Sequence, residues 1–213
     1  MKITGAIFDF DGTLFDSMHV WKGIRCKFFE YLGLEFTKED AEFFKGLYLS
    51  ESIPLIIEKY NLNTTYDDLM NELFEYIKGL YLVDAVPKND IVDFLEMLKA
   101  NGVKMGIATA TGEPALIALL EKFDMLHYFS AIYSTFTVGA AKTEPKVYDV
   151  VLDAIGTDKD TTWVFEDALY AAKTAKTNGY KVVGIYDKSE PETDELKNLV
   201  DIYIHNYSEL DLL

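Results

Sequence analysis

The chain has 213 residues, 49% of them hydrophobic, enough to bury the core of one domain with an insertion or of two small domains. Its formal net charge of −16 argues against nucleic acid or an anionic membrane surface as a partner, because both would repel it. The single cysteine, Cys26, cannot form an internal disulfide, and no apolar run approaches the roughly 20 residues that span a bilayer. Since residues 1–4 also lack the pattern of a signal peptide, we expect a soluble cytoplasmic protein.

The first predicted element is a buried strand over residues 3–10, a short apolar run that ends in carboxylates. Side chains alternate along a strand, so Asp9 and Asp11 point the same way, and Gly12 permits a sharp turn after them. An ordinary strand-to-loop transition with acidic residues and a turn glycine would have the same sequence. The pair therefore marks a candidate site only in combination with other groups.

A series of about four helices is predicted over residues 17–81, without a strand between them. Apolar residues recur at intervals of three and four over residues 21–32, and Gly33 stands where a helix often ends. Thr37 and Thr65 each precede an acidic residue by three positions, which predicts a capping box at two further helix starts. This part of the chain is therefore expected to be all-α.

Beyond residue 87 helices and strands alternate. Helices are predicted at 91–100, 114–123, 146–154 and 169–177, and strands at 103–109, 131–134, 162–165, 181–186 and 201–204. Strands that are regularly separated by helices imply right-handed βαβ units and a parallel sheet covered on both faces.

The expected fold class is therefore α/β, a Rossmann-like parallel sheet core with an inserted all-α helical-bundle cap. We assign residues 1–15 and 84–213 to the α/β core and residues 16–83 to the cap. The chain crosses between the two parts near Asp16 and at residues 83–87, which makes these segments the expected hinges.

Polar groups follow three further strands, at the sheet edge where ligands of open parallel sheets bind. They are Thr109 with the backbone of Ala110, Lys142, and the adjacent pair Glu166 and Asp167. Each alone has an ordinary explanation: Thr109 as a helix N-cap, Lys142 as solvated surface, and the acids as a favourable helix start.

The combination of these groups with Asp9 and Asp11 is more informative than any one of them. Two like charges about 4 Å apart cost about 4 kcal/mol at an effective dielectric constant of 20. Four carboxylates at one sheet edge therefore require compensation, which a bound Mg²⁺ together with Lys142 would supply. The same two cations would also neutralise an incoming phosphate.

These motifs resemble the haloacid dehalogenase-like superfamily over the whole chain. The most specific parts are Asp9-Phe10-Asp11-Gly12-Thr13-Leu14 and Glu166-Asp167, the latter with Ala175 and Gly179 at the spacing of the family. A helical insertion directly after the first motif is similar to the branch that contains β-phosphoglucomutase and phosphoglycolate phosphatase.

The resemblance implies a role for each of these residues. Asp9 would be the nucleophile and Asp11 the general acid and base, while Thr109, Ala110 and Lys142 would bind phosphate. The metal ligands would be Asp9, Asp11 through its backbone carbonyl, Asp167, and Glu166 directly or through water.

The sequence departs from the family pattern at three places. Ala141-Lys142-Thr143 stands where Gly-Lys-Pro is common, and Ala168 and Ala171 replace the usual Ser and Gly. The one arginine, Arg25, lies in the first cap helix, so residues 46–52 lack the arginine with which sugar-phosphate mutases of this branch hold a second phosphate. The last departure counts against a mutase.

The expected function is a Mg²⁺-dependent phosphatase that hydrolyses a small phosphorylated metabolite, a sugar phosphate or phosphoglycolate-like compound, through an aspartyl phosphate. We expect a monomer with no nucleic-acid or membrane partner. The cap residues expected to face the substrate are His19, Lys22, Lys45, Tyr48 and Ser50.

Two alternatives remain open. A β-phosphoglucomutase-like phosphosugar mutase would use the same core residues, and a non-catalytic phospho-receiver or binding module would also need acids, a Thr and a Lys at strand ends. Receivers are shorter and have no helical insertion. A dehalogenase would have no use for a proton-shuttling Asp11.

Overall fold

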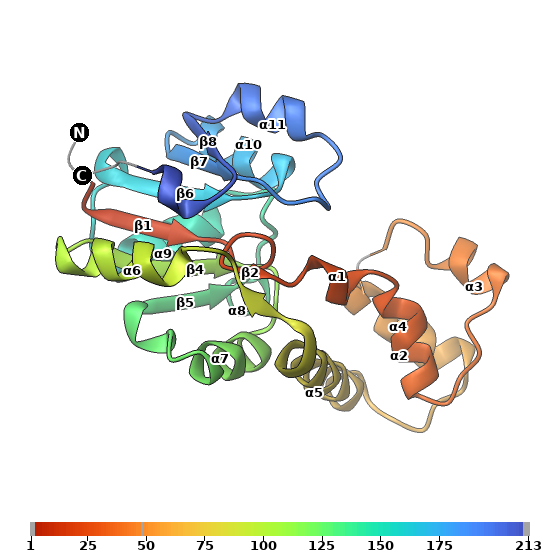
Figure 1. Cartoon of the computed structure of the whole chain (residues 1–213). Coiled ribbons are helices and arrows are strands. Elements are labelled where there is room, and N and C mark those ends of the chain that lie inside the picture. The colour runs from red at the N-terminus through yellow and green to blue at the C-terminus, as the bar shows by residue number, and fades with distance from the viewer. Residues whose placement is uncertain (1–2, 48, 211–213) are drawn as a thin grey trace.

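The computed structural model describes residues 3–47 and 49–210, and it contains a parallel sheet with a group of helices to one side (Figure 1). The sheet strands are β1 (Gly5–Phe8), β4 (Lys104–Thr109), β5 (Ala131–Ser134), β6 (Thr162–Glu166), β7 (Lys181–Ile185) and β8 (Ile202–Ile204). Their order is β5-β4-β1-β6-β7-β8, and every neighbouring pair is parallel. The predicted α/β fold class is confirmed.

The register of the central strands determines which residues meet at the carboxyl edge of the sheet. Phe8 at the end of β1 is paired with Ile107 of β4 on one side and with Phe165 of β6 on the other. The residues that follow these three positions are therefore neighbours, although they lie far apart in sequence.

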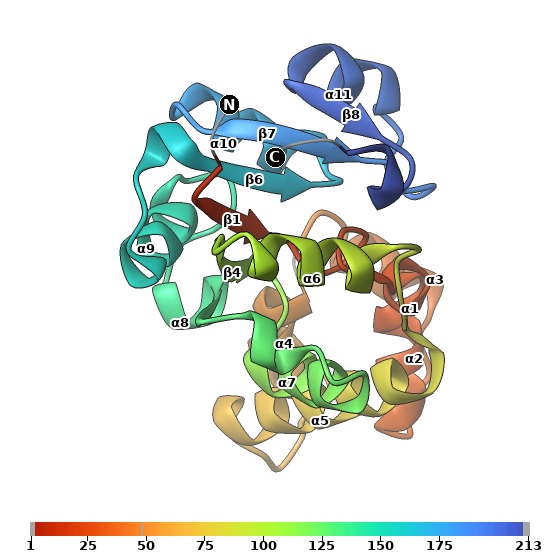
Figure 2. The ribbon, with the colours of Figure 1, turned by 60° about the vertical axis from the view of Figure 1, so that its left-hand side comes forward.

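Helices cover both faces of the sheet (Figure 2). They are α6 (Ile91–Ala100), α7 (Glu113–Lys122), α8 (Thr135–Val138), α9 (Lys146–Ile155), α10 (Leu169–Thr177) and α11 (Thr193–Leu199), with 3-10 turns at Leu126–Tyr128, Lys159–Thr161 and Tyr207–Glu209. On one face Phe94 of α6 packs on Phe8 and Phe165, whose rings stack at 4.4 Å. On the other, Val151 of α9 belongs to the same buried cluster as Ile7.

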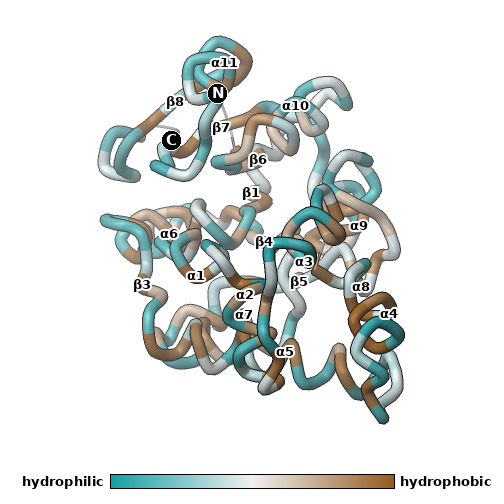
Figure 3. The backbone as a smooth tube through the Cα atoms, turned by 90° about the vertical axis from the view of Figure 1, so that its right-hand side faces the viewer, coloured by the Kyte–Doolittle hydropathy of each residue, from teal (hydrophilic) through white to brown (hydrophobic). Residues whose placement is uncertain are grey.

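The helices beside the sheet form the cap. They are α1 (Met18–Trp21), α2 (Ile24–Tyr31), α3 (Lys38–Phe43), α4 (Leu49–Lys59) and α5 (Tyr66–Asp84). Along α5 hydrophobic and hydrophilic residues alternate, the pattern of a helix with one buried face (Figure 3). In the part of the chain that the structure describes, no helix combines the length and the apolar character needed to cross a bilayer.

The first cap helix differs from the expected single helix. It is divided into α1 and α2 because Gly23 adopts a left-handed conformation, with φ of 69°, which a glycine reaches without steric cost. Gly33, with φ of 72°, ends α2 as predicted.

The two predicted capping boxes have different outcomes. At Thr37 both reciprocal bonds to Asp40 are present, which confirms the first box. At Thr65 only the bond from the Asp68 amide is present, and the Asp68 carboxylate accepts from the Thr65 hydroxyl at 2.7 Å instead of from the backbone. The prediction at Thr65 was therefore right about the helix N-cap and wrong about the reciprocal bond of a capping box.

The two crossings between cap and core lie side by side. They form a short antiparallel pair, β2 (Phe15–Asp16) with β3 (Val86–Pro87), in which Phe15 faces Pro87. The last cap helix, α5, also packs against α7 of the core. The division into a core of residues 1–15 and 84–213 and a cap of residues 16–83 remains a prediction about independent units.

A partly buried ion pair stabilises the cap, and we expect Asp40→Asn to lower the free energy of unfolding by about 2 kcal/mol, the scale of a hydrogen bond to a charged group. Lys59 Nζ lies 2.7 Å from the buried Asp40 carboxylate. Burial raises the pKa of Asp40, but the hydrogen bonds from Lys59 and Thr37 outweigh it and hold this pKa well below its ordinary value of 3.8.

The pH dependence of this stabilisation follows from the lowered pKa. A carboxyl whose pKa is lower in the folded state stabilises the protein fully above 3.8 and loses that contribution as pH falls below it. Urea unfolding at pH 7 and pH 3 should therefore show a smaller difference between wild type and Asp40→Asn at pH 3. The matched control is Asp68→Asn, at the same position of an exposed helix start, with a change under about 0.5 kcal/mol.

Candidate active site

The loop after β1 turns sharply against the loop after β6. Gly12 has φ of 78°, and a Cβ atom there would lie 2.1 Å from Asp167 Oδ2. Only glycine allows this approach, because any other side chain would overlap the carboxylate. Thr13 donates to the same carboxylate at 3.1 Å, so the first motif directly positions Asp167.

Three of the predicted acids meet at this edge of the sheet. Asp9, Glu166 and Asp167 each offer an oxygen within 4.8 Å of the others, and all three are buried. The structure therefore brings together the carboxylates from the first and fourth motifs.

Lys142 joins this cluster from the loop before α9. Its ammonium contacts Asp9 Oδ1 and lies 2.5 Å from Glu166 Oε1, and only 4% of the residue is exposed. Burial lowers the pKa of Lys142, but the charges of Asp9 and Glu166 outweigh burial and raise it above its usual value. Lys142 is therefore held as a cation, not placed on the solvated surface.

The cluster still has more negative than positive charge. Burial, together with the charges of Asp9 and Glu166, raises the pKa of Asp167 well above its usual range. Glu166 Oε2 is buried, and no hydrogen-bond partner for it lies among the described residues. Hard carboxylate oxygens that lack a counter-charge fit a divalent cation such as Mg²⁺.

The carboxylate of Asp11 lies outside the cluster and is held by three hydroxyl groups. It accepts hydrogen bonds from Ser17 at 2.6 Å, from Thr111 at 2.5 Å and from Tyr81. Tyr81 comes from the last turn of α5 and accepts in turn from Trp21 Nε1 at 3.0 Å. Cap side chains therefore fix the orientation of Asp11.

The second motif presents Ala110 and Thr111 to the site more directly than Thr109. Ala110 and Thr111 line a cavity above the acids. Thr109 is fully buried, and its hydroxyl accepts the Thr111 amide proton at 3.0 Å. In this structure Thr109 thus supports the turn that carries Thr111.

The cavity between core and cap has a volume of about 670 Å³, and Asp9, Asp11, Lys142 and Asp167 line its core side. Of the predicted cap contacts it includes Ser50. His19 and Lys45 are not among the lining residues and instead face Asp16 at 3.6 Å and Glu42 at 3.4 Å.

The remaining two cap predictions are Lys22 and Tyr48. Lys22 is exposed and is also absent from the lining, and Tyr48 falls outside the described residues. A charged residue in a cap helix is thus a poor indicator of a position in the cavity lining without knowledge of which way the helix faces.

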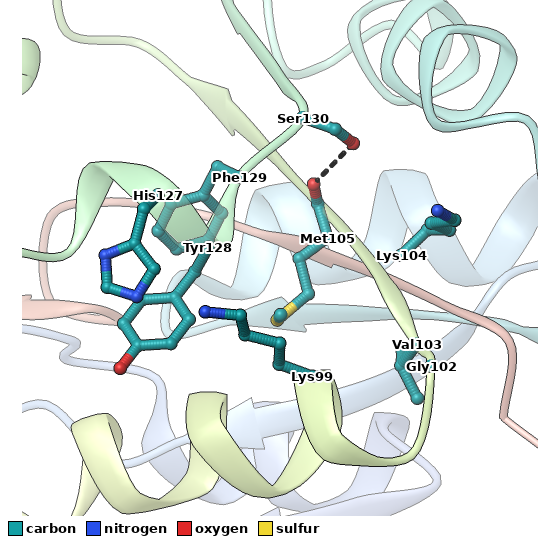
Figure 4. A pocket seen from close by; sticks show the side chains of 9 residues that line it. All are labelled: Lys99, Gly102, Val103, Lys104, Met105, His127, Tyr128, Phe129 and Ser130. Atoms are coloured by element: carbon teal, nitrogen blue, oxygen red, sulfur yellow. Dashed lines mark hydrogen bonds between the residues drawn. The ribbon is translucent and has the colours of Figure 1, made fainter.

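A smaller cavity of about 270 Å³ lies at the other end of β4, where Ser130 Oγ donates to the Met105 carbonyl at 3.2 Å (Figure 4). Lys99, Lys104 and His127 line it with their neighbours, and it contains no carboxylate. None of the predicted site residues lies there. Asp9, Asp11, Asp167, Lys142 and the second motif line the larger cavity instead.

Comparison with known proteins gives consistent matches. Residues 6–185 match the family model described as haloacid dehalogenase-like hydrolase. A phosphorylated carbohydrates phosphatase of Thermotoga maritima is 23% identical, over 81% of this chain and 80% of the relative. Hexitol phosphatase B of Escherichia coli is also 23% identical, over 98% of this chain and 95% of the relative.

Solved structures show the same fold. CbbY from Rhodobacter sphaeroides, crystallised in complex with phosphate, superposes with a TM-score of 0.79 at 21% identity, over 98% of this chain and 96% of that one. A putative β-phosphoglucomutase from Thermotoga maritima gives a TM-score of 0.72 at 21% identity with the same coverage.

Proposed function

This chain belongs to the haloacid dehalogenase-like hydrolase family, as its motifs predict, and on that premise we propose that it is a Mg²⁺-dependent phosphatase of a small phosphate monoester. The observation that carries the proposal is the buried group of Asp9, Glu166, Asp167 and Lys142, because all of them except Glu166 line the floor of a cavity large enough for a metabolite. The phosphatases among its relatives support the same reading.

Asp9 is the proposed nucleophile. It lies at the cavity floor. Burial raises the pKa of Asp9, and its contact with Lys142 acts in the opposite direction, toward the ionised carboxylate that attack requires. A carboxylate oxygen would attack phosphorus, the ester oxygen would leave, and an aspartyl phosphate would form. Water would then attack this phosphate and restore Asp9.

Asp11 is the proposed proton carrier. It would give a proton to the departing alcohol in the first step and take one from water in the second. Its three hydroxyl partners hold the carboxylate at one side of the cavity floor, where it lines the same space as Asp9. The separation of the two acids into different environments suits two different roles.

Asp9, Glu166 and Asp167 would hold the metal, and the backbone carbonyl of Asp11 is the fourth proposed ligand. When bound, Mg²⁺ would neutralise phosphate charge and stabilise the charge that develops during transfer. Lys142 and Ala110 are the proposed phosphate-binding residues, with Thr111 added from the cavity lining. Thr109 would act through the turn that carries Thr111. One chain supplies every one of these groups, so a monomer is sufficient.

A phosphosugar mutase is less well supported. Lys142 is the one cation among the described residues that line the cavity. The guanidinium of Arg25 donates instead to the carbonyls of Phe44 and Leu47, at 3.0 and 2.7 Å. A second phosphate would therefore meet no positive partner in the described lining.

The proposal is tested by hydrolysis of p-nitrophenyl phosphate by the purified protein. We expect turnover with Mg²⁺, and a loss of at least about a hundredfold after chelation, because the buried acids would repel the phosphate. Activity should return when Mg²⁺ is added back. Turnover that is unchanged by chelation would contradict the metal dependence, and the absence of turnover with Mg²⁺ would contradict the phosphatase.

Tyr81 is expected to position Asp11, so Tyr81→Phe should lower kcat about tenfold with little change in KM. The phenol donates to the Asp11 carboxylate, and a hydrogen bond to a charged group contributes about 1.5 to 3 kcal/mol. The matched control is Tyr76→Phe on the same helix, whose hydroxyl donates to the Lys27 carbonyl at 3.3 Å away from the site. Equal kcat values for the two variants would contradict this role.

A further inference from the structure

The cavity above the acids has two unlike walls. Its core side carries the charged groups, whereas its cap side consists of the apolar side chains of Met18, Trp21, Leu49, Leu73, Phe74 and Ile77. Ser50 is the one polar cap residue in the described lining. A phosphate at the acids would therefore point the rest of its molecule toward an apolar surface.

Hydrogen-bonding groups near this wall are largely engaged already. The indole N–H of Trp21 donates to Tyr81, and the Tyr81 hydroxyl donates to Asp11. Lys142 contacts two acids. Besides Thr111, which donates to Asp11, the hydroxyl groups of the described lining are those of Ser50, Thr135 and Tyr170. A sugar with several hydroxyl groups would lose more hydrogen bonds to water than these three groups can replace.

The apolar surface continues onto the core at the cavity mouth. The Phe74 ring packs edge to face on Phe136 of α8, with centroids 5.4 Å apart. It also lies so close to Gly112 that a Cβ atom there would be 2.7 Å from the ring. Phe136 lines the cavity and remains 44% exposed, as an apolar surface that a bound molecule could cover.

Charge points to the same conclusion. Glu144 adds a negative group to the lining, beside Asp9, Asp11 and Asp167, and Lys142 is the single cation among the described lining residues. A second phosphate or a carboxylate on the ligand would be repelled. The part of the ligand beyond the phosphate must therefore be uncharged or cationic. The apolar wall excludes a cationic group, because burying its charge there would be costly.

We propose that the group esterified to the phosphate is an uncharged apolar skeleton, aryl or alkyl, rather than a polyhydroxylated sugar or a second acid. This assignment rests on the proposed phosphatase function, because it takes the acidic end of the cavity as the phosphate position. It separates this chain from the relatives named for carbohydrate and hexitol substrates.

Binding of phosphonates tests the assignment without turnover, because their P–C bond is not hydrolysed. Isothermal titration calorimetry with Mg²⁺ present would compare methyl-, propyl- and hexylphosphonate with the 6-phosphonate analogue of glucose. We expect Kd to fall about fourfold for each added methylene. A series without this trend, or tighter binding of the glucose analogue than of hexylphosphonate, would overturn the proposal.

Two leucines one helical turn apart on α5 provide a matched pair of variants. Leu73 lines the cavity, whereas Leu69 is equally buried but absent from the lining. Leu73→Ala should weaken hexylphosphonate about tenfold relative to methylphosphonate, and Leu69→Ala should leave that ratio unchanged. Using the ratio within each variant removes any general loss of folded protein, and equal ratios in both variants would also overturn the proposal.

The outcome for the proposed function is read separately, from p-nitrophenyl phosphate turnover. Hydrolysis of this ester, together with a Kd that does not change along the phosphonate series, would indicate a phosphatase with a different leaving group. A Kd that falls with each added methylene, without hydrolysis of the ester, would support the apolar assignment for a protein that binds phosphate esters but does not hydrolyse them.

Discussion

Asp9→Asn is expected to lower the turnover of p-nitrophenyl phosphate by at least about 10⁴-fold, the scale seen when a catalytic nucleophile is removed. The amide keeps the shape of the side chain but has no anionic oxygen with which to attack phosphorus. It would also lose the charge that contacts Lys142. The measurement is initial rate at saturating Mg²⁺, with thermal unfolding as a check that the variant is folded.

A matched control separates loss of the nucleophile from a general effect of Asp-to-Asn replacement. Asp124 has a fully exposed side chain and a left-handed backbone that asparagine also adopts, so Asp124→Asn should retain activity within about twofold. Acid-quenched wild type should carry phosphate on the peptide that contains Asp9. A variant at Asp9 with a tenth of the wild-type rate would contradict nucleophilic catalysis by this residue.

The sheet could be predicted from the sequence because its strands are short apolar runs buried on both faces. Residues 131–134 were predicted as a strand and form β5, and residues 162–165 fall within β6. A parallel sheet then leaves little freedom for the strand ends, so the meeting of Asp9 with Glu166 and Asp167 follows from topology.

The cap side of the site could not be predicted in the same way. A helix periodicity gives the buried face but not which of two partners, core or cap, that face meets. His19 and Lys45 were therefore expected at the substrate and instead face acids outside the cavity. The site was also expected to need a hydroxyl at Thr109, where the structure presents Thr111 to the cavity.

Tyr81 is a residue of the site that the sequence analysis did not identify. It stands in an ordinary amphipathic helix, 70 residues after the acid that it contacts, and no local pattern distinguishes it from other buried tyrosines. The break between α1 and α2 could have been found, because Gly23 lies inside an apolar periodicity and glycine often interrupts a helix.

Lys142→Met is expected to lower kcat/KM by about 10³-fold or more, because it removes the cation among the described residues of the cavity lining while keeping a side chain of similar length. In the wild type the Lys142 ammonium contacts Asp9 and Glu166, so it offsets acid charge and would also meet the phosphate. Loss of this cation should weaken phosphate binding and reduce the stabilisation of the charge that develops during transfer.

The control for this charge removal lies one turn along the chain. Lys146 is exposed and donates to the Val138 carbonyl at 3.0 Å, so Lys146→Met should keep kcat/KM within about twofold. Because Lys142→Met leaves three buried acids without a lysine, its thermal midpoint should rise more on Mg²⁺ addition than that of wild type. Equal Mg²⁺ stabilisation of both proteins, with unchanged kcat/KM, would show that Lys142 neither balances the acids nor binds the phosphate.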